Sequence, residues 1–517
     1  MYNIAFQIKK HYERFNLQQK SMLDIQKKKA NSFFALLSMP STAMGFTLSV
    51  QISALSWILS TKYGLSIDKI GIVWAAGPIA GILAQPIVGA ISDKTWFMGG
   101  RRRPWIILGS LLGALMLLAL PNLGIIQSIF VSGNDPKAGL LAVAVVVALL
   151  LDLSINVSLN PTRSLVADCT TMEERGKGYT WMQTISGSFG VLAYFIGGVF
   201  GNIILIYVGA MVTFLGAVIP TMLIEEPRRL ENVEDTKKTI KTSSKSTIKD
   251  IFISLLPLAG LIIYGIYVLI SKLFGLDMQG GVAFVGIRLG IVEFVSALIF
   301  IVTSLMVLLN VLKVSSKANE YQKVLLAHSF TWVGVQTMFI YAFFFLSDKM
   351  NLDEVAGKVN SLAFFILSLA SAVLPVFVLN PVAKKIGMVK THYIAMFIMA
   401  LGYGGIFLVA RTVPMYYLFM AIAGIGWGSV VSLPFAIMSE KVDQTKMGLY
   451  MGIFNLSVVL PQLVASFKMG EVINSHSDKT VIFAICAVTL LVSAILWMFV
   501  KNEKVEPSET KIEKLGH

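Results

Sequence analysis

Long apolar segments separated by short polar stretches fill the chain from residue 33 to residue 500. A helix needs about 20 apolar residues to cross the hydrocarbon core of a bilayer. Fourteen segments reach that length, so the pattern predicts an all-α polytopic membrane protein. The predicted spanning helices lie at 33–60, 70–92, 104–122, 139–160, 180–200, 203–224, 251–271, 284–312, 325–347, 359–379, 391–409, 415–438, 447–466 and 480–500.

The longest polar break, residues 225–250, divides these helices unequally. It has mixed charge and is rich in Ser, Thr and Lys, which is typical of a linker. Six helices precede it, and two more helices, a short basic loop and another six follow. Twelve helices with one re-entrant stretch is the alternative. We predict this domain order: a cytoplasmic N-terminal segment (1–32), a six-helix half (33–224), the linker (225–250), two additional helices (251–312), a second half (313–500) and a cytoplasmic tail (501–517).

Composition and charge support a membrane location. Of all residues, 56% are hydrophobic and only 14% are charged, whereas soluble domains carry roughly 25% charged residues. The net charge of +14 lies in the loops, and most of the 43 lysines and arginines fall on one side when the N-terminus is inside. The positive-inside rule then places both termini in the cytoplasm. Residues 1–32 are polar and basic and lead into a first helix without a cleavage site, which suits the inner (plasma) membrane of a bacterium.

The stretch 149–168, LLLDLSINVSLNPTRSLVAD, carries polar residues into an apolar segment. A carboxylate inside a membrane helix is costly and marks a functional site by default. Asp152, Asn156 and Arg163 stand at i, i+4 and i+11, which is one helix face. This face must look into a bundle or a water-filled cavity, so the stretch predicts a transporter.

A basic loop follows the second predicted helix. Gly89 permits close helix packing, Asp93 stands where that helix meets the cytoplasm, and three arginines follow at 101–103. The Gly-x-x-x-Asp-Lys order is more specific than a basic cluster alone. We predict a cytoplasmic gate of ion pairs that form in one access state and break in the other, built from Gly89, Asp93, Arg101, Arg102, Arg103, Arg163 and Asp168.

Several stretches together resemble one family. Residues 74–94 (WAAGPIAGILAQPIVGAISDK) with RRRP at 101–104, the stretch 151–168, and GLYMGIFNLSVVLPQ at 448–462 are similar to the sucrose/maltose branch of the major facilitator superfamily. A weaker match is Phe330-Thr331-Trp332 with Tyr341. The resemblance implies proton-coupled uptake of a disaccharide or related glycoside by two rocking six-helix halves, with Asp152 taking and releasing the proton. It implies nothing for residues 251–312, because ordinary members have twelve helices.

Sugar binding needs amides and carboxylates for hydroxyl groups and aromatic faces for the sugar ring, within a largely apolar pocket. Trp332 and Gln336 stand one turn apart on a predicted helix, and Asn455 and Gln462 two turns apart on another. For any single residue, packing between helices is an equally good explanation. The substrate-binding candidates are Gln51, Asn156, Trp332, Gln336, Tyr341, Asn455 and Gln462.

Other chemistry has little support. The sequence has no phosphate-binding loop of the Gly-x-x-x-x-Gly-Lys-Ser/Thr type, no cofactor motif, no cluster of metal ligands and no nucleophile beside a base, so an enzyme is not expected. Arg288 and Glu293 fall in the second additional helix on different faces. A facilitator or exporter of a non-sugar compound and a non-transporting sugar sensor remain alternatives. Sodium also remains open as the coupling ion.

Overall fold

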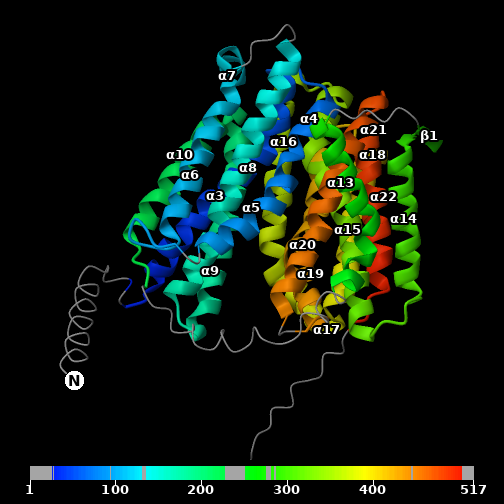
Figure 1. Cartoon of the computed structure of the whole chain (residues 1–517). Helices are drawn as coiled ribbons and strands as arrows, with labels where there is room; N and C mark the ends of the chain where they lie inside the picture. Colours follow the sequence, from blue (N-terminus) through cyan, green and yellow to red (C-terminus); the bar gives the residue numbers. More distant parts are fainter. Residues whose placement is uncertain are drawn as a thin grey trace, which may run out of the picture. The chain divides into compact units, whose positions relative to one another are not determined.

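The computed structural model describes residues 26, 28–92, 95–130, 136–227, 251–274, 281–284, 287–443 and 446–502. Within these residues, thirteen helices are long and apolar enough to cross a membrane, which confirms a multi-pass, all-α protein (Figure 1). The chain forms two compact units. Unit 1 comprises residues 1–244, 339–365 and 465–479, and unit 2 comprises residues 245–338, 366–464 and 480–517.

The N-terminal half of the chain supplies most of unit 1. Its elements, coloured from blue to green in Figure 1, are α3 (Asn31–Thr61), α4 (Ile67–Trp74), α5 (Ala76–Ser92), α6 (Arg103–Ala119), η1 (Leu120–Asn122), α7 (Leu123–Phe130), α8 (Pro136–Cys169), α9 (Met172–Phe200) and α10 (Asn202–Leu223). Helix α3 packs against α9 and α10, while α8 packs against α5 and α6.

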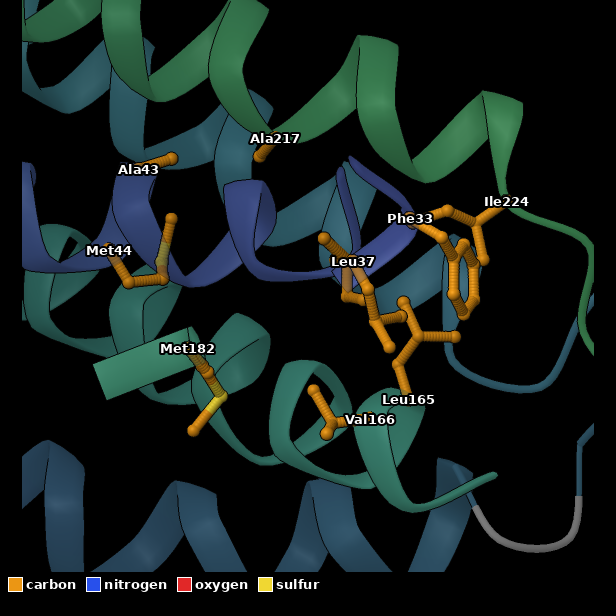
Figure 2. Packing of buried hydrophobic residues seen from close by; sticks show 10 residues of the cluster. Phe33, Leu37, Ala43, Met44, Leu165, Val166, Met182, Ala217 and Ile224 are labelled. Carbon is orange, nitrogen blue, oxygen red and sulfur yellow. The ribbon is translucent and has the colours of Figure 1, made fainter. Parts of the chain in front are cut away.

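Apolar side chains from these helices meet in one buried cluster (Figure 2). Phe33 and Leu37 of α3 lie close to Leu165 and Val166 of α8, and Ile106 of α6 joins them. Small residues allow the helices to approach, since a methyl group at Gly109 would lie 2.7 Å from the Ser154 carbonyl oxygen. Close packing, rather than the hydrophobic effect, holds helices together within a bilayer.

The remaining elements follow residue 250. They are η2 (Leu256–Leu258), α13 (Ala259–Phe274), β1 (Gly281–Phe284), β2 (Ile287–Gly290), α14 (Ile291–Leu308), α15 (Ser316–Phe344), η3 (Phe345–Lys349), α16 (Asp353–Leu374), η4 (Pro375–Leu379), α17 (Asn380–Ile386), α18 (Met388–Leu408), α19 (Val413–Glu440), α20 (Met447–Val464), η6 (Ala465–Met469), α21 (Gly470–Ser475) and α22 (Val481–Met498). In unit 2, α18 packs against α19 and α22, and α13 packs against α14 and α20.

Unit 1 also contains two pieces of the C-terminal half, residues 339–365 and 465–479. Helix α4 packs against α21, and the Ser56 hydroxyl donates to the Ile340 carbonyl at 2.7 Å. A hydroxyl network joins Ser53, Asn202 and Ser361, in which Ser361 Oγ donates to Asn202 Oδ1 at 2.9 Å. Hydrogen bonds between uncharged groups thus hold segments from both halves of the sequence together within unit 1.

Several predicted helices differ from the observed elements. The second predicted helix, 70–92, is divided at Ala75 into α4 and α5. Neither part is counted among the spanning helices, which explains why thirteen spans are observed among the described residues where fourteen were predicted. The fourth does not end at Pro161, because α8 continues to Cys169. A helical proline removes one backbone donor, a loss that neighbouring helices tolerate in membrane proteins.

The prediction of a helix over 284–312 was wrong at its start. Strands β1 and β2 pair in an antiparallel arrangement that sets Gly281 opposite Gly290, and α14 begins only at Ile291. Arg288 therefore lies on β2 rather than in a spanning helix. Glu293 Oε2 accepts from the Gly290 backbone N–H at 3.0 Å, so this acid caps the helix N-terminus.

Candidate functional site

Asp152 lies on α8 with its side chain almost fully buried, at 7% exposure. Gln51 of α3, exposed to only 3%, donates from Nε2 to Asp152 Oδ2 at 3.0 Å. The donor is a neutral amide, and none of the ion pairs among the described residues includes Asp152. An amide N–H can donate to a carboxylate or to the carbonyl oxygen of a protonated carboxyl group. Both protonation states of Asp152 therefore keep this partner.

Asn156 follows one turn later on α8, also buried. Its amide donates to the Asp152 backbone carbonyl at 2.8 Å, rather than to the Asp152 carboxyl group. Opposite these residues stands the Gly77-x-x-x-Gly81 face of α5. A methyl group at Gly77 would lie 3.3 Å from Asp152 Oδ1, and one at Gly81 would lie 4.0 Å from Asn156 Oδ1. The two glycines thus leave room beside both polar side chains.

A second polar cluster lies in unit 2. Gln462 of α20 donates from Nε2 to Gln336 Oε1 of α15 at 3.1 Å. One turn before Gln336, the Trp332 ring meets the Trp427 ring edge to face, with centroids 6.2 Å apart. The structure therefore brings together one member of each predicted pair, Gln336 and Gln462, which are far apart in sequence. Asn455 is half-buried on the same helix as Gln462.

His328 is a further member of this cluster, at 2% exposure. The Trp332 indole donates from Nε1 to His328 Nε2 at 2.9 Å, so that nitrogen is an acceptor and the imidazole is neutral. The His328 ring also stacks on Phe454 at 4.8 Å. The sequence predicts a helix that starts at residue 325, but α15 begins at Ser316, so His328 lies inside the helix. Its packing there fixes the orientation of Trp332.

Tyr341 does not lie in the polar cluster of Trp332 and Gln336, although all three were predicted to bind the substrate. It belongs to unit 1, whereas Trp332 and Gln336 belong to unit 2. Its fully buried hydroxyl donates to the carbonyls of Ala465 and Ser466, each at 3.2 Å. These bonds tie the end of α15 to η6, which is a packing role.

The charged motif forms ion pairs with the end of α8. Arg102 Nε lies 3.1 Å and Arg101 NH2 lies 3.4 Å from Asp168 Oδ2. The Arg102 guanidinium also donates to Ser92 Oγ at 2.9 Å. Arg103 instead donates from Nε to the Thr221 carbonyl at 3.1 Å. Two of the three arginines thus lie within ion-pair distance of Asp168.

The other predicted gate residues contribute less. Arg163 is exposed and makes no ion pair within the described part of the chain. It stands five residues before Asp168, which turns it to a different face of α8. Gly89 lies on α5, and Asp93 falls outside the described residues.

Sequence reasoning missed Glu226, which was assigned to the linker. This acid is 2% exposed. Its carboxylate accepts the backbone N–H groups of Arg101 at 2.8 Å, Arg102 at 3.0 Å and Arg103 at 2.6 Å. Glu226 thereby caps the start of α6 and holds the arginine loop against the end of α10. The only sequence signal is an acidic pair directly after an apolar helix.

Metal ligands do not gather in the described ranges, where no group of three or more His, Cys, Asp or Glu side chains could hold an ion. The two cysteines, Cys169 and Cys486, are both free.

Solved structures with a similar fold include the nucleoside transporter NupG, with a TM-score of 0.56, 12% identity and coverage of 91% of this chain and all (100%) of that chain. The inward-open xylose transporter XylE from E. coli gives a TM-score of 0.58 at 14% identity and covers 92% of this chain and 97% of that chain. At such low identity, these matches show the fold alone.

Similar sequences among curated proteins include several that are transport proteins by name. A general alpha-glucoside permease of Schizosaccharomyces pombe is 30% identical over 31% of this chain and 31% of its own length. The human proton-associated sugar transporter A is 30% identical over 35% of this chain and 26% of its own length. The rice sucrose transport protein SUT5 (Oryza sativa subsp. indica) is 32% identical over 26% of this chain and 26% of its own length. Each alignment thus covers a third or less of the relative.

The sequence pattern of the Major Facilitator Superfamily matches residues 41–466, which is most of the chain. This match spans both polar clusters and the charged motif, and it agrees with the helical fold of the solved structures. The chain therefore belongs to the major facilitator superfamily.

Proposed function

We propose that the protein imports a disaccharide or related glycoside, such as maltose or sucrose, together with protons by alternating access. The buried Asp152 carboxyl group with its neutral Gln51 partner carries this proposal. Burial favours the uncharged form of a carboxyl group, and hydration favours the charged form. The carboxyl group therefore releases a proton when a change of access exposes it to water, and it takes a proton up when a change of access buries it again.

The remaining clusters support the same function. Amide groups of Gln336 and Gln462 suit sugar hydroxyl groups, and the Trp332 and Trp427 rings suit the apolar face of a sugar. The names of the relatives, which include an alpha-glucoside permease and a sucrose transport protein, agree with a glycoside substrate. We propose the plasma membrane as the location, with both termini in the cytoplasm, because the basic residues concentrate on that side.

The ion pairs of Arg101 and Arg102 with Asp168 serve as the cytoplasmic latch in this proposal. Such pairs have two arrangements, made and broken, which gives the bistable element that alternating access requires. Both arginines lie on a loop whose shape is fixed by Glu226, so the latch moves as one piece with the start of α6.

The test is uptake of labelled maltose and sucrose into proteoliposomes, with and without an inward proton gradient, for wild type and Asp152→Asn. We expect the gradient to stimulate wild-type uptake, and the variant to lose this stimulation while it still exchanges sugar. Asp348→Asn, at an exposed acid, is the matched control and should behave as wild type.

Uptake that ignores both the gradient and Asp152→Asn would contradict proton coupling and leave a facilitator. A sodium gradient that replaces the proton gradient would change the coupling ion and keep the symporter. Failure of both sugars to enter would contradict the substrate class.

A further inference from the structure

A network of hydroxyl and amide groups joins α3, α10 and α16 within unit 1. Ser361 Oγ donates to Asn202 Oδ1 at 2.9 Å, and Ser53 Oγ donates to the same oxygen at 3.3 Å. The two hydroxyl groups also lie within hydrogen-bond distance of each other, and Asn202 Nδ2 donates to the Ser53 backbone carbonyl at 3.4 Å. All three side chains are buried, at 3% exposure or less. These uncharged groups therefore satisfy one another, as burial requires.

This network lies at the opposite end of α10 from the arginine loop. Helix α10 begins at Asn202, whereas Arg103 donates to the Thr221 carbonyl near the other end of the helix. Its 22 residues span about 33 Å at about 1.5 Å per residue, close to the thickness of about 30 Å of the hydrocarbon core. Unit 1 therefore has the Arg101–Asp168 ion pair near one membrane surface and the network near the other. In the proposed orientation, the network is on the outer side.

Helix α16 contributes residues to both units. Its residues 353–365 belong to unit 1, and its residues 366–374 belong to unit 2. Ser361 lies in the first part, so the network binds the start of α16 to α3 and α10, although α16 comes from the C-terminal half of the chain. A rocking motion of the two halves has to separate these helices when the outer side opens. The network is therefore a contact that such a motion must break.

A further bond lies on the same face of α3. Ser56 follows Ser53 by three residues, which places both on one side of the helix. The Ser56 hydroxyl donates to the Ile340 carbonyl of α15 at 2.7 Å and accepts from Trp74 Nε1 of α4 at 2.8 Å. Ile340 also comes from the C-terminal half of the chain and belongs to unit 1. One face of α3 thus bonds to two helices of that half through neutral groups.

Glycines bring the helices around the network into close contact. A methyl group at Gly197 of α9 would lie 3.0 Å from Ser361 Oγ. One at Gly357 of α16 would lie 2.6 Å from Trp57 Cδ1 of α3. Small residues let helix backbones approach this closely, so no sugar-sized molecule fits between these helices. The contact is therefore closed to a sugar.

We propose that Ser53, Asn202 and Ser361 form the outer gate of the transporter, closed in this structure, and that their hydrogen bonds break whenever the outer side opens. This gate rests on the proposed function, because only a transporter needs one. Loss of a single neutral hydrogen bond shifts an equilibrium about fivefold. A substitution that removes one bond of the gate should therefore increase the population of the outward-open state by about that factor.

The experiment measures access from the outside in the absence of sugar. Cys169 and Cys486 are replaced by Ser, and Asn360→Cys is introduced as a reporter. Asn360 is 2% exposed, and its Oδ1 has no hydrogen-bond partner within the described part of the chain, so its replacement breaks no bond of that oxygen. It lies one turn before Phe364, whose ring meets the Tyr194 ring of α9. The reporter therefore faces a helix of the N-terminal half.

A membrane-impermeant maleimide is applied to intact cells, and the rate at which it labels Asn360→Cys is measured with and without a second change. We expect Ser361→Ala and Asn202→Ala each to raise this rate about fivefold. The combination of both should give less than the product of the two effects, because the partners share one bond. Ser371→Ala is the matched control and should leave the rate unchanged, since this hydroxyl donates within α16, to the Ser368 carbonyl at 2.9 Å.

The thermal unfolding midpoint of each purified variant separates opening of the gate from unfolding. Ser53→Ala takes the place of any variant with a lowered midpoint, because it removes the other hydroxyl group of the network. Equal labelling rates in all variants, an equal rise in Ser371→Ala, or labelling only after permeabilisation of the cells would overturn the proposal. The expected labelling pattern without uptake of maltose or sucrose would support the gate and contradict only the proposed substrate.

Discussion

Asp152 has room for its carboxyl group because Gly77 has no side chain. A methyl group at Gly77 would lie 3.3 Å from Asp152 Oδ1. Gly77→Ala should therefore press on Asp152 and Gln51 without unfolding α5. An overpacking cost of about 1 kcal/mol corresponds to a roughly fivefold loss of uptake rate. Gly187→Ala on α9 is the control, since nothing lies within 4 Å of that position. Uptake by Gly77→Ala at the wild-type rate would show that this contact does not constrain the carboxyl group.

The Gln336–Gln462 hydrogen bond predicts coupled effects on substrate affinity. Each change to Ala removes one neutral donor–acceptor group, worth about 0.5–1.5 kcal/mol. We expect Gln336→Ala and Gln462→Ala each to raise KM several-fold and to leave the maximal rate nearly unchanged. The double variant should show less than the product of the two effects, because the partners share one bond. Independent effects in concentration-dependent uptake would argue against a shared role.

Among elements, the start of α6 depends most clearly on a distant residue. Glu226 accepts three backbone N–H groups there, so Glu226→Ala should lower the free energy of unfolding by about 1–3 kcal/mol. Glu226→Gln keeps an acceptor oxygen and should lose less. Thermal unfolding in detergent measures both, with Asp348→Ala as the exposed control, which should stay within about 0.5 kcal/mol of wild type. Equal stability of all three variants would exclude a capping role.

At the scale of the whole molecule, the proposed orientation places residues 380–390 and 467–479 on opposite sides of the membrane. Single cysteines can be introduced at Lys384 and Asp478, both exposed loop-proximal positions, after replacement of Cys169 and Cys486. A membrane-impermeant maleimide should label Asp478→Cys in intact cells, and Lys384→Cys only after permeabilisation. The reverse pattern would invert the topology and move the Arg101–Asp168 latch to the outer face.

The helices themselves follow from local sequence, because an apolar run of about 20 residues in a bilayer must satisfy its backbone hydrogen bonds internally. The same reasoning placed Asp152 and Asn156 on one face, since helical periodicity is a local property. It failed at residues 287–290, which pair with residues 281–284 as antiparallel strands, because apolarity alone does not distinguish a helix from a short strand. It also ended the fourth helix too early at Pro161.

Partners distant in sequence could not be predicted. Gln51 meets Asp152 at a sequence separation of 101 residues, Glu226 reaches the arginine loop from the end of α10, and Tyr341 serves packing in one unit while Trp332 lies in the other. Amphipathic and charged patterns show which side chains must find a partner, but not which one. The sequence by itself determined that this chain crosses the membrane many times and carries an acid inside it. Only the tertiary structure decided what surrounds that acid, because contacts between helices depend on how their small residues let them pack.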